Sequence, residues 1–192
     1  GNAGYLSARY GVDGSGFDEF VWDSFSSPTN VTVREIQWRG TRSGSVPADF
    51  QISINTQALP GGTVWNLGGT ASETPTSTPG VYDYRFTLPA GFVLTGGQTN
   101  WLQVFATQNG MPDWHWSAAT SGNNSHYSQV PAVTGNYRFI LTGGDVAFTL
   151  LDAATIPETI TVNALPDAGG TVTGGGTYQP GTNVTVQAIP AG

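Results

Sequence analysis

Hydrophobic and polar residues alternate along most of the first 152 residues, which is the pattern of half-buried β-strands. Tyr82, Tyr84, Phe86 and Leu88 alternate with polar neighbours, and residues 50–55 repeat the pattern. Further candidate strands cover residues 17–25, 30–39, 101–107, 113–118, 137–142 and 146–152. No stretch keeps apolar residues at helical spacing for three turns. The pattern therefore predicts an all-β fold, an antiparallel β-sandwich of the jelly-roll type.

One candidate strand changes its parity within the apolar pattern. Val31 and Val33 share one face, whereas Ile36 and Trp38 fall on the opposite one. A β-bulge near residues 34–35 would bring all four side chains onto the core side.

Residues 66–80 form the longest turn-like connection, and they show no periodicity. A connection of this length predicts a functional or mobile loop. Residues 110–113 and 121–134 are the other long connections.

The composition changes near residues 152–158, after which Tyr178 is the only aromatic residue. Residues 160–166 match residues 184–190 in residue type, and the glycine-rich stretch 169–178 between them predicts a hairpin. We therefore expect three parts, a β-sandwich over residues 1–152, a linker over 153–158 and a partial β-repeat over 159–192.

Two stretches resemble known modules. The tail sequence TVNALPDAGGTVTGGGTYQPGTNVTVQAIP resembles the internalin-type B repeat of bacterial surface proteins. That resemblance implies a β-grasp-like spacer without chemistry of its own, here incomplete. The segments FVWDSFSSPTNVTVREIQWRG, YDYRFTLP and DWHWSAAT resemble jelly-roll, lectin-like or carbohydrate-binding domains of secreted bacterial proteins. This second resemblance implies a fold and an extracellular location, but no catalytic residues.

Composition narrows the classes of function. The chain of 192 residues has 13 acidic and 6 basic residues, with a net charge of −7, and it contains neither Cys nor Lys. This balance disfavours nucleic acid as a partner. The lack of Cys is typical of exported bacterial proteins of this composition, and no segment has the roughly 18 apolar residues of a membrane helix. We expect a secreted or cell-surface bacterial protein without a membrane span, monomeric and tethered to other domains of its parent chain.

The tetrapeptide Asp113-Trp114-His115-Trp116 is the most informative motif. On a strand, its two indoles point to one face and the other two side chains to the opposite face. Either the indoles form a platform for a sugar, or they belong to the core and the polar face is the site.

Sugar binding combines flat aromatic rings with polar side chains that bind hydroxyl groups. Trp22, Trp38 and Trp101 lie in apolar runs and are expected to fill the core. The predicted ligand-binding residues are Trp114, Trp116, Asp113, His115, Trp65, Arg39, Asn123 and Tyr127. The leading hypothesis is a non-catalytic carbohydrate-binding module that holds a polysaccharide or a cell-surface glycan.

Closely spaced oxygen ligands suggest calcium. Asp13, Asp18 and Glu19 lie in a Gly-rich segment, so we expect a structural Ca²⁺ there and no required cofactor. A transition-metal site built from His115, His126 and Asp113 is less favoured, because no spacing motif supports it.

Two alternatives remain open. The protein is a structural or adhesive spacer on the cell surface if all its tryptophans fill the core. It is a polysaccharide-active enzyme if two carboxylates face a cleft. The four Glu residues form no closely spaced acidic motif, and no G-x-S-x-G nucleophile elbow is present, so no catalytic residue is predicted.

Overall fold

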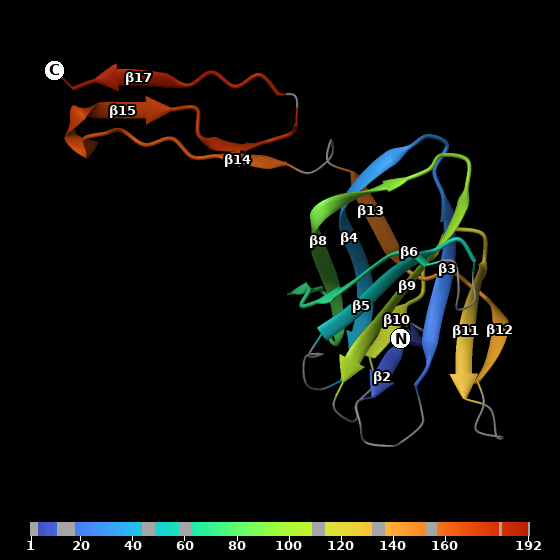
Figure 1. Cartoon of the computed structure of the whole chain (residues 1–192). Coiled ribbons are helices and arrows are strands. Elements are labelled where there is room, and N and C mark those ends of the chain that lie inside the picture. Colours follow the sequence, from blue (N-terminus) through green and yellow to red (C-terminus); the bar gives the residue numbers. More distant parts are fainter. Residues whose placement is uncertain are drawn as a thin grey trace.

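Two β-sheets pack face to face as a sandwich in this computed structural model (Figure 1). The structure describes residues 4–10, 18–43, 49–57, 63–108, 114–131, 137–152, 157–180 and 182–191. We call the sheet nearer the viewer in Figure 1 the front sheet and the other the back sheet.

The front sheet has the strand order β12-β11-β3-β9-β5-β6. Its strands are β12 (Tyr137–Gly143), β11 (Ser125–Pro131), β3 (Phe20–Ser26), β9 (Thr99–Gln108), β5 (Asp49–Asn55) and β6 (Thr63–Gly69). These pairings are antiparallel, while the short β2 (Ala8–Tyr10) lies parallel to the end of β9.

The back sheet has the order β1-β10-β4-β8-β7. Its strands are β1 (Gly4–Leu6), β10 (Trp114–Ser117), β4 (Val31–Arg42), β8 (Val81–Leu94) and β7 (Ser72–Pro75). A further strand, β13 (Phe148–Asp152), pairs with the first half of β4, whereas β10 pairs with its last residues. The predicted all-β, antiparallel sandwich is thus confirmed.

The core lies between the inner faces of the two sheets and follows the predicted alternation. On β8, Tyr84, Phe86 and Leu88 are buried, and the polar residues between them are exposed. The register of β4 against β8 shifts between Val33 and Glu35. This irregularity is the predicted bulge, and it puts Val33, Ile36 and Trp38 in the same core cluster.

Two predicted connections contain strands. Residues 66–80 include the end of β6 and all of β7, so the expected long loop is wrong. Residues 121–134 include β11, which pairs along its length with β12. Both segments are rich in polar residues and in Gly, Ser or Thr, which hides the apolar period of a strand.

The tail carries four short strands around a 3₁₀ turn, η1 (Asp167–Gly169). Here β14 (Glu158–Ile160) pairs with β16 (Gly176–Tyr178), and β15 (Gly170–Thr173) pairs with β17 (Gln187–Pro190). The predicted hairpin over residues 169–178 is therefore wrong, because its two arms pair with other strands. Within the described part of the chain, no helix has the length and apolar character needed to cross a membrane.

Candidate functional site

The two tryptophans of the Asp113-Trp114-His115-Trp116 motif belong to the core. Both indoles are 0% exposed. Trp114 lies edge to face on Phe50, and Trp116 donates its Nε1–H to the Ala147 carbonyl oxygen at 3.0 Å. Stacking of either ring on a sugar is thus excluded, which corrects the leading prediction. Inward-facing indoles fill the wide space between two sheets, where no other residue buries so much apolar surface.

The other predicted residues do not share one surface with the two indoles. His115 is half-buried and, by strand alternation, faces away from the core side of β10. Arg39 makes a bidentate ion pair with Asp83, with nitrogen–oxygen distances of 2.7 and 3.0 Å. Trp65 is half-buried and packs on Phe92 and the core cluster. Asp113 lies outside the described residues.

A second aromatic cluster covers the outer face of the front sheet. Phe20, Trp22 and Phe105 are buried there, and Trp101 and Tyr127 pack partly exposed against them. Their strand neighbours Val21, Leu102 and Val104 belong instead to the core between the sheets. Because successive side chains of a strand point to opposite faces, the cluster faces outward.

The strand register arranges this outer face in cross-strand rows. One row runs over all six strands, from the apolar side to the polar side, as Leu141, Tyr127, Trp22, Gln103, Ser53 and Asn66. Directly opposed residues of antiparallel strands share a face, so these six side chains form one continuous band. Leu141 is 58% exposed, and Asn66 is exposed at the other end.

The neighbouring rows add rings and amides. Trp101 lies between Ser24 on β3 and Asn55 on β5. Phe20 faces Gln129, and Phe105 faces Gln51, with the two phenyl rings 4.7 Å apart. We call this surface the aromatic face, and its members are Phe20, Trp22, Ser24, Gln51, Ser53, Asn55, Asn66, Trp101, Gln103, Phe105, Tyr127, Gln129 and Leu141.

Trp101 and Tyr127 are the partly exposed rings of the aromatic face. Their centroids are 5.3 Å apart and their planes meet at 65°. Beside them the polar groups are already oriented, since Ser53 donates to the Gln103 Oε1 at 2.9 Å and the Asn55 amide donates to Ser53 at 3.0 Å. Prearranged amides and hydroxyls around a ring lower the entropic cost of binding a polar ligand.

A loop brings Asn123 to the edge of this face. Its amide donates to the Ser24 hydroxyl at 2.7 Å, and Ser24 lies opposite Trp101. Asp145 holds the loop, because its carboxylate accepts the backbone N–H groups of Asn123 and Asn124 at 3.0 and 2.8 Å. Asn124 has a φ of 59°, a left-handed conformation that Asn tolerates better than most residues.

Two buried titratable groups support the loop from the inner side. Asp23 accepts N–H bonds from Ser24 and Val146, and burial raises the pKa of its carboxyl to about 6. His126 lies opposite Asp23 on the neighbouring strand, and its Nδ1 donates to the Gly144 carbonyl oxygen at 2.7 Å. Burial lowers the pKa of His126, so the ring is neutral near pH 7.

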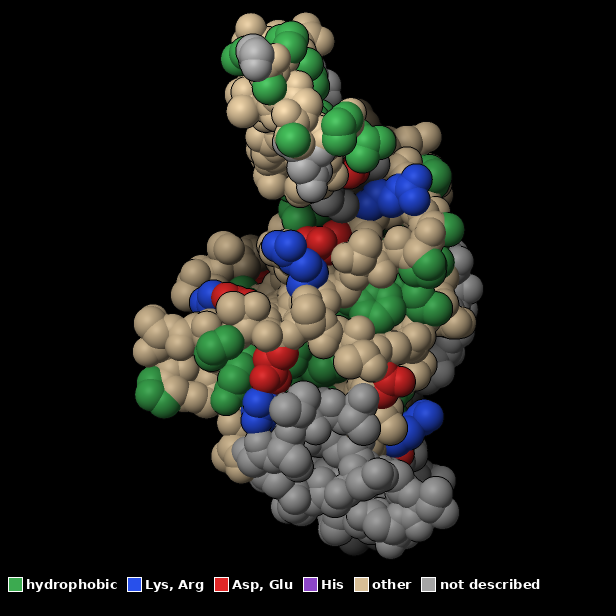
Figure 2. Space-filling model, turned by 90° about the vertical axis from the view of Figure 1, so that its left-hand side faces the viewer, with side chains coloured by type: hydrophobic (Ala, Val, Ile, Leu, Met, Phe, Trp, Pro, Cys, Tyr) green, Lys and Arg blue, Asp and Glu red, His purple; other side chains and the backbone are tan. Residues whose placement is uncertain are grey.

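A groove of about 990 Å³ is lined by strands of the back sheet, by residues 118–122 and 145–149, and by Asp23 and Ser24 of the front sheet. Its lining includes Gln37, Arg39, Asp83 and Arg85 on the strands and both Asp23 and Asp145 at one end. Figure 2 shows arginine and carboxylate side chains adjoining one another on the side that carries β8. Arg39 and Arg85 are paired with Asp83 and Glu35, so these two arginines are already engaged within the protein and less available to a charged ligand in the groove.

The two carboxylates of the groove hold backbone rather than point into open space. Asp23 and Asp145 are 2% and 7% exposed. Each of their four oxygens accepts a backbone N–H. This arrangement is that of carboxylates which fix a loop.

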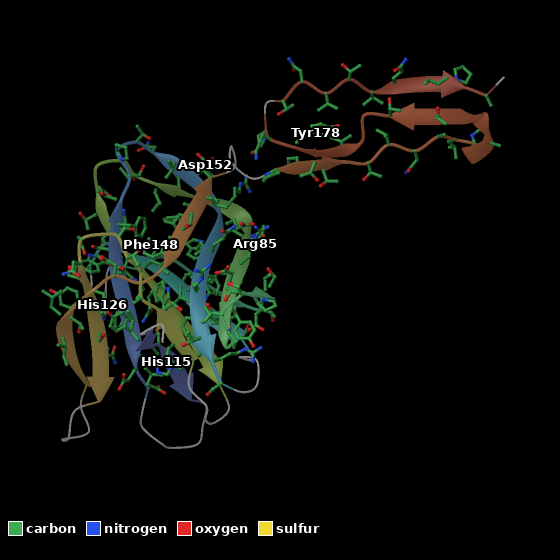
Figure 3. All side chains as sticks on the ribbon, turned by 180° about the vertical axis from the view of Figure 1, so that it is seen from behind. Arg85, His115, His126, Phe148, Asp152 and Tyr178 are labelled. Atoms are coloured by element: carbon green, nitrogen blue, oxygen red, sulfur yellow. The ribbon has the colours of Figure 1, made fainter. Side chains whose placement is uncertain are left out.

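The calcium prediction stays untested. Asp13 lies outside the described residues, Asp18 lies 3.9 Å from Arg9, and Glu19 pairs through its backbone with Ala8. Among the residues that the structure describes, no three His, Asp or Glu side chains are grouped to hold a metal ion. His115 and His126, labelled in Figure 3, lie on strands of different sheets, and the third residue of the metal set considered above, Asp113, lies outside the described residues.

Trp22 is buried in an aromatic cluster, in agreement with its predicted core position, whereas Trp101, also expected in the core, is partly exposed. Tyr127 lies on the same face and Asn123 at its edge, and their role in ligand binding stays a prediction. The alternation of side chains in the run Trp101-Leu102-Gln103-Val104 is the sequence feature that could have shown that Trp101 faces outward. Leu102 and Val104 face the core, and the tryptophan shares its face with Gln103. Comparison of the chain with protein-family models, with curated proteins and with solved structures finds no match. The two resemblances stated above therefore remain predictions.

Proposed function

We propose that this protein is a non-catalytic carbohydrate-binding module that holds polysaccharide on the aromatic face of its front sheet. The observation that carries the proposal is the pairing of Trp101 and Tyr127, the partly exposed rings of that face, with amides and hydroxyls in the adjoining rows. Aromatic rings bind the CH face of a pyranose, and neighbouring amides exchange hydrogen bonds with its hydroxyls.

The surroundings of the two rings support a ligand with many hydroxyl groups. Gln103 lies one row from Trp101 on the same strand. Asn55 lies opposite Trp101 on β5, where it is buried and holds the Ser53 hydroxyl beside Gln103. Ser24 and Asn123 are already hydrogen-bonded to each other at the same edge. A protein partner of ordinary size would instead need an extended apolar surface, whereas the central rings Phe20, Trp22 and Phe105 are buried.

The proposal also includes the secreted or cell-surface location expected from composition. A polysaccharide outside the cell is a target that a tethered module meets at high local concentration. Binding by one module would then hold the remainder of the parent chain near the polysaccharide.

Binding to glycans tests the proposal directly. The full chain is incubated with insoluble cellulose, chitin, mannan and xylan, and affinities for soluble oligosaccharides of any retained glycan are measured by calorimetry. Trp101→Ala and Tyr127→Ala are each expected to weaken binding by about 10- to 100-fold, the effect of losing a central ring.

Arg39→Gln is the matched control, because Arg39 lies on the outer side of the back sheet. It is expected to leave glycan binding unchanged. Loss of binding in Arg39→Gln together with full binding in Trp101→Ala would move the site to the groove and refute the proposal.

A further inference from the structure

The aromatic face has polar groups of one kind. In its described rows they are amides and hydroxyls, contributed by Ser24, Gln51, Ser53, Asn55, Asn66, Gln103 and Gln129. None of these side chains carries a charge at any pH in ordinary use. Neighbouring Asp23 is turned to the inner side, where it binds Val146.

Two described charged side chains, those of Arg9 and Asp49, stand at one end of this face. Arg9 on β2 and Asp49 on β5 both lie opposite Thr107 on β9, beyond the row of Phe105. The Arg9 guanidinium already lies 5.2 Å from the Phe105 ring centroid, 5.6 Å from that of Phe20 and 3.9 Å from Asp18. This cation is therefore engaged by the protein and distant from the row of Trp101.

The net charge of the whole chain also disfavours anionic ligands, through long-range electrostatic repulsion. Its net charge is −7, and it has no Lys. Over a screening length of about 8 Å at physiological salt, such a field repels a polymer with a carboxylate on every residue. A buried contact between an anionic sugar and the described residues in the rows of Trp101 and Tyr127 would also leave the carboxylate without a cationic partner among them, which is costly.

We infer that the aromatic face selects neutral polysaccharides and rejects polyuronates. This inference rests on the proposed function and adds the class of ligand to it. Recognition then depends on ring contacts and neutral hydrogen bonds, so it is insensitive to ionic strength. The expected change in dissociation constant between 20 and 500 mM NaCl is less than about twofold, because no ion pair is screened.

A chemically matched pair of ligands tests the inference. The full chain is measured against soluble glucan, mannan and galactan, and against the same chains oxidised at C6 to the uronic acid. Alginate and pectate are included as natural polyuronates. We expect one neutral chain to bind, and its oxidised form to bind at least about tenfold more weakly at 20 mM NaCl.

The outcomes separate the two proposals. Binding of alginate, pectate or an oxidised chain as tightly as the neutral one overturns the inference and leaves the proposed function standing. Loss of that anionic binding in Arg9→Gln would identify the cation responsible. If no neutral or anionic chain binds at all, the proposed function itself fails.

Discussion

The indole of Trp101 and the phenol of Tyr127 meet edge to face on the outer side of the front sheet, with ring centroids 5.3 Å apart. They come from β9 and β11, which are not neighbours, since β3 lies between them. Trp22 on β3 bridges the gap, because it stands opposite Tyr127. Three strands therefore cooperate to place the two rings, and the rigidity of the sheet fixes their relative orientation.

Trp→Phe substitutions at a core position and at a surface position should differ in their effect on stability. Trp116→Phe removes a buried ring and the hydrogen bond to Ala147, so we expect it to lower the free energy of unfolding by about 2–3 kcal/mol. Trp101→Phe removes the same atoms at a half-buried position and should cost less than about 1 kcal/mol. Urea denaturation measures both. Equal losses would contradict the assignment of the two residues to different sides.

Alternation of polar and apolar residues was sufficient to predict the sandwich and the bulge of β4. It was not sufficient to say which face of a strand meets the core when both faces are apolar. In β9, the sequence WLQVFA offers large residues on both sides, and pairing with β3 and β5 decides the outcome. For Trp114 and Trp116 the ambiguity was different. Their opposite face carries Asp113 and His115, and the pattern only slightly favoured the core for the indoles.

Strands made mainly of polar residues were also not predicted from the sequence. Glu73 was expected in a mobile loop, but it lies on β7 and pairs with Arg42 on β4. This strand shows no apolar alternation, because it is held by the ion pair of Glu73 and by backbone hydrogen bonds to β8 rather than by buried apolar side chains. Such pairings depend on residues distant in the chain and are not visible in a local pattern.

Two arginine ion pairs should differ in their contribution to stability. Arg42 makes a bidentate pair with Glu73 at 2.6 and 2.9 Å and lies 4.2 Å from the Tyr82 ring centroid, with its side chain only 12% exposed. Hydrogen bonding to Arg42 also lowers the pKa of Glu73. Arg42→Gln should therefore reduce the free energy of unfolding by about 2 kcal/mol.

Arg39→Gln is the comparison, since the pair of Arg39 with Asp83 is about half exposed on both sides. Its loss should cost less than about 0.5 kcal/mol, because water screens exposed pairs. Chemical denaturation of the parent protein and both variants under the same conditions measures the two losses in unfolding free energy. A larger loss for Arg39→Gln than for Arg42→Gln is the result that would not fit.

Removal of the Asp145 carboxylate should release the loop of Asn123. Asp145→Ala leaves two backbone N–H groups without their acceptor, and we expect a loss of about 2–3 kcal/mol in unfolding free energy. Hydrogen exchange of the Asn123 and Asn124 amides should accelerate more than that of the β9 amides. Asp145→Asn retains one acceptor oxygen and should have an intermediate effect. Unchanged exchange at both amides would show that other contacts hold the loop.

Asp23 and His126 should have opposite effects on the pH dependence of stability. The raised pKa of Asp23 means that the folded protein takes up a proton at higher pH than the unfolded chain. Its contribution to unfolding free energy therefore increases by about 1 kcal/mol as the pH falls from 7.5 to 5. The lowered pKa of His126 has the reverse sign, because the unfolded chain binds that proton first and stability falls as the pH drops through about 6.5.

Two variants separate these contributions when unfolding is measured at pH 7.5 and pH 5. His126→Gln should gain stability on acidification relative to the parent protein, and Asp23→Asn should lose it. Differences between the two pH values remove any constant effect of each substitution. Identical pH differences in all three proteins would argue against buried, shifted groups at these positions.

The position of the binding face is tested most directly by the indole Nε1–H signals of ¹⁵N-labelled protein during titration with a glycan that the full chain retains. Trp101→Phe identifies the signal of Trp101, and Trp116→Phe and Trp114→Phe identify the two core indoles. We predict that the Trp101 signal shifts with ligand, while those of Trp114 and Trp116, both 0% exposed, stay in place. Movement of the Trp114 or Trp116 signal with an unchanged Trp101 signal at saturation would contradict it.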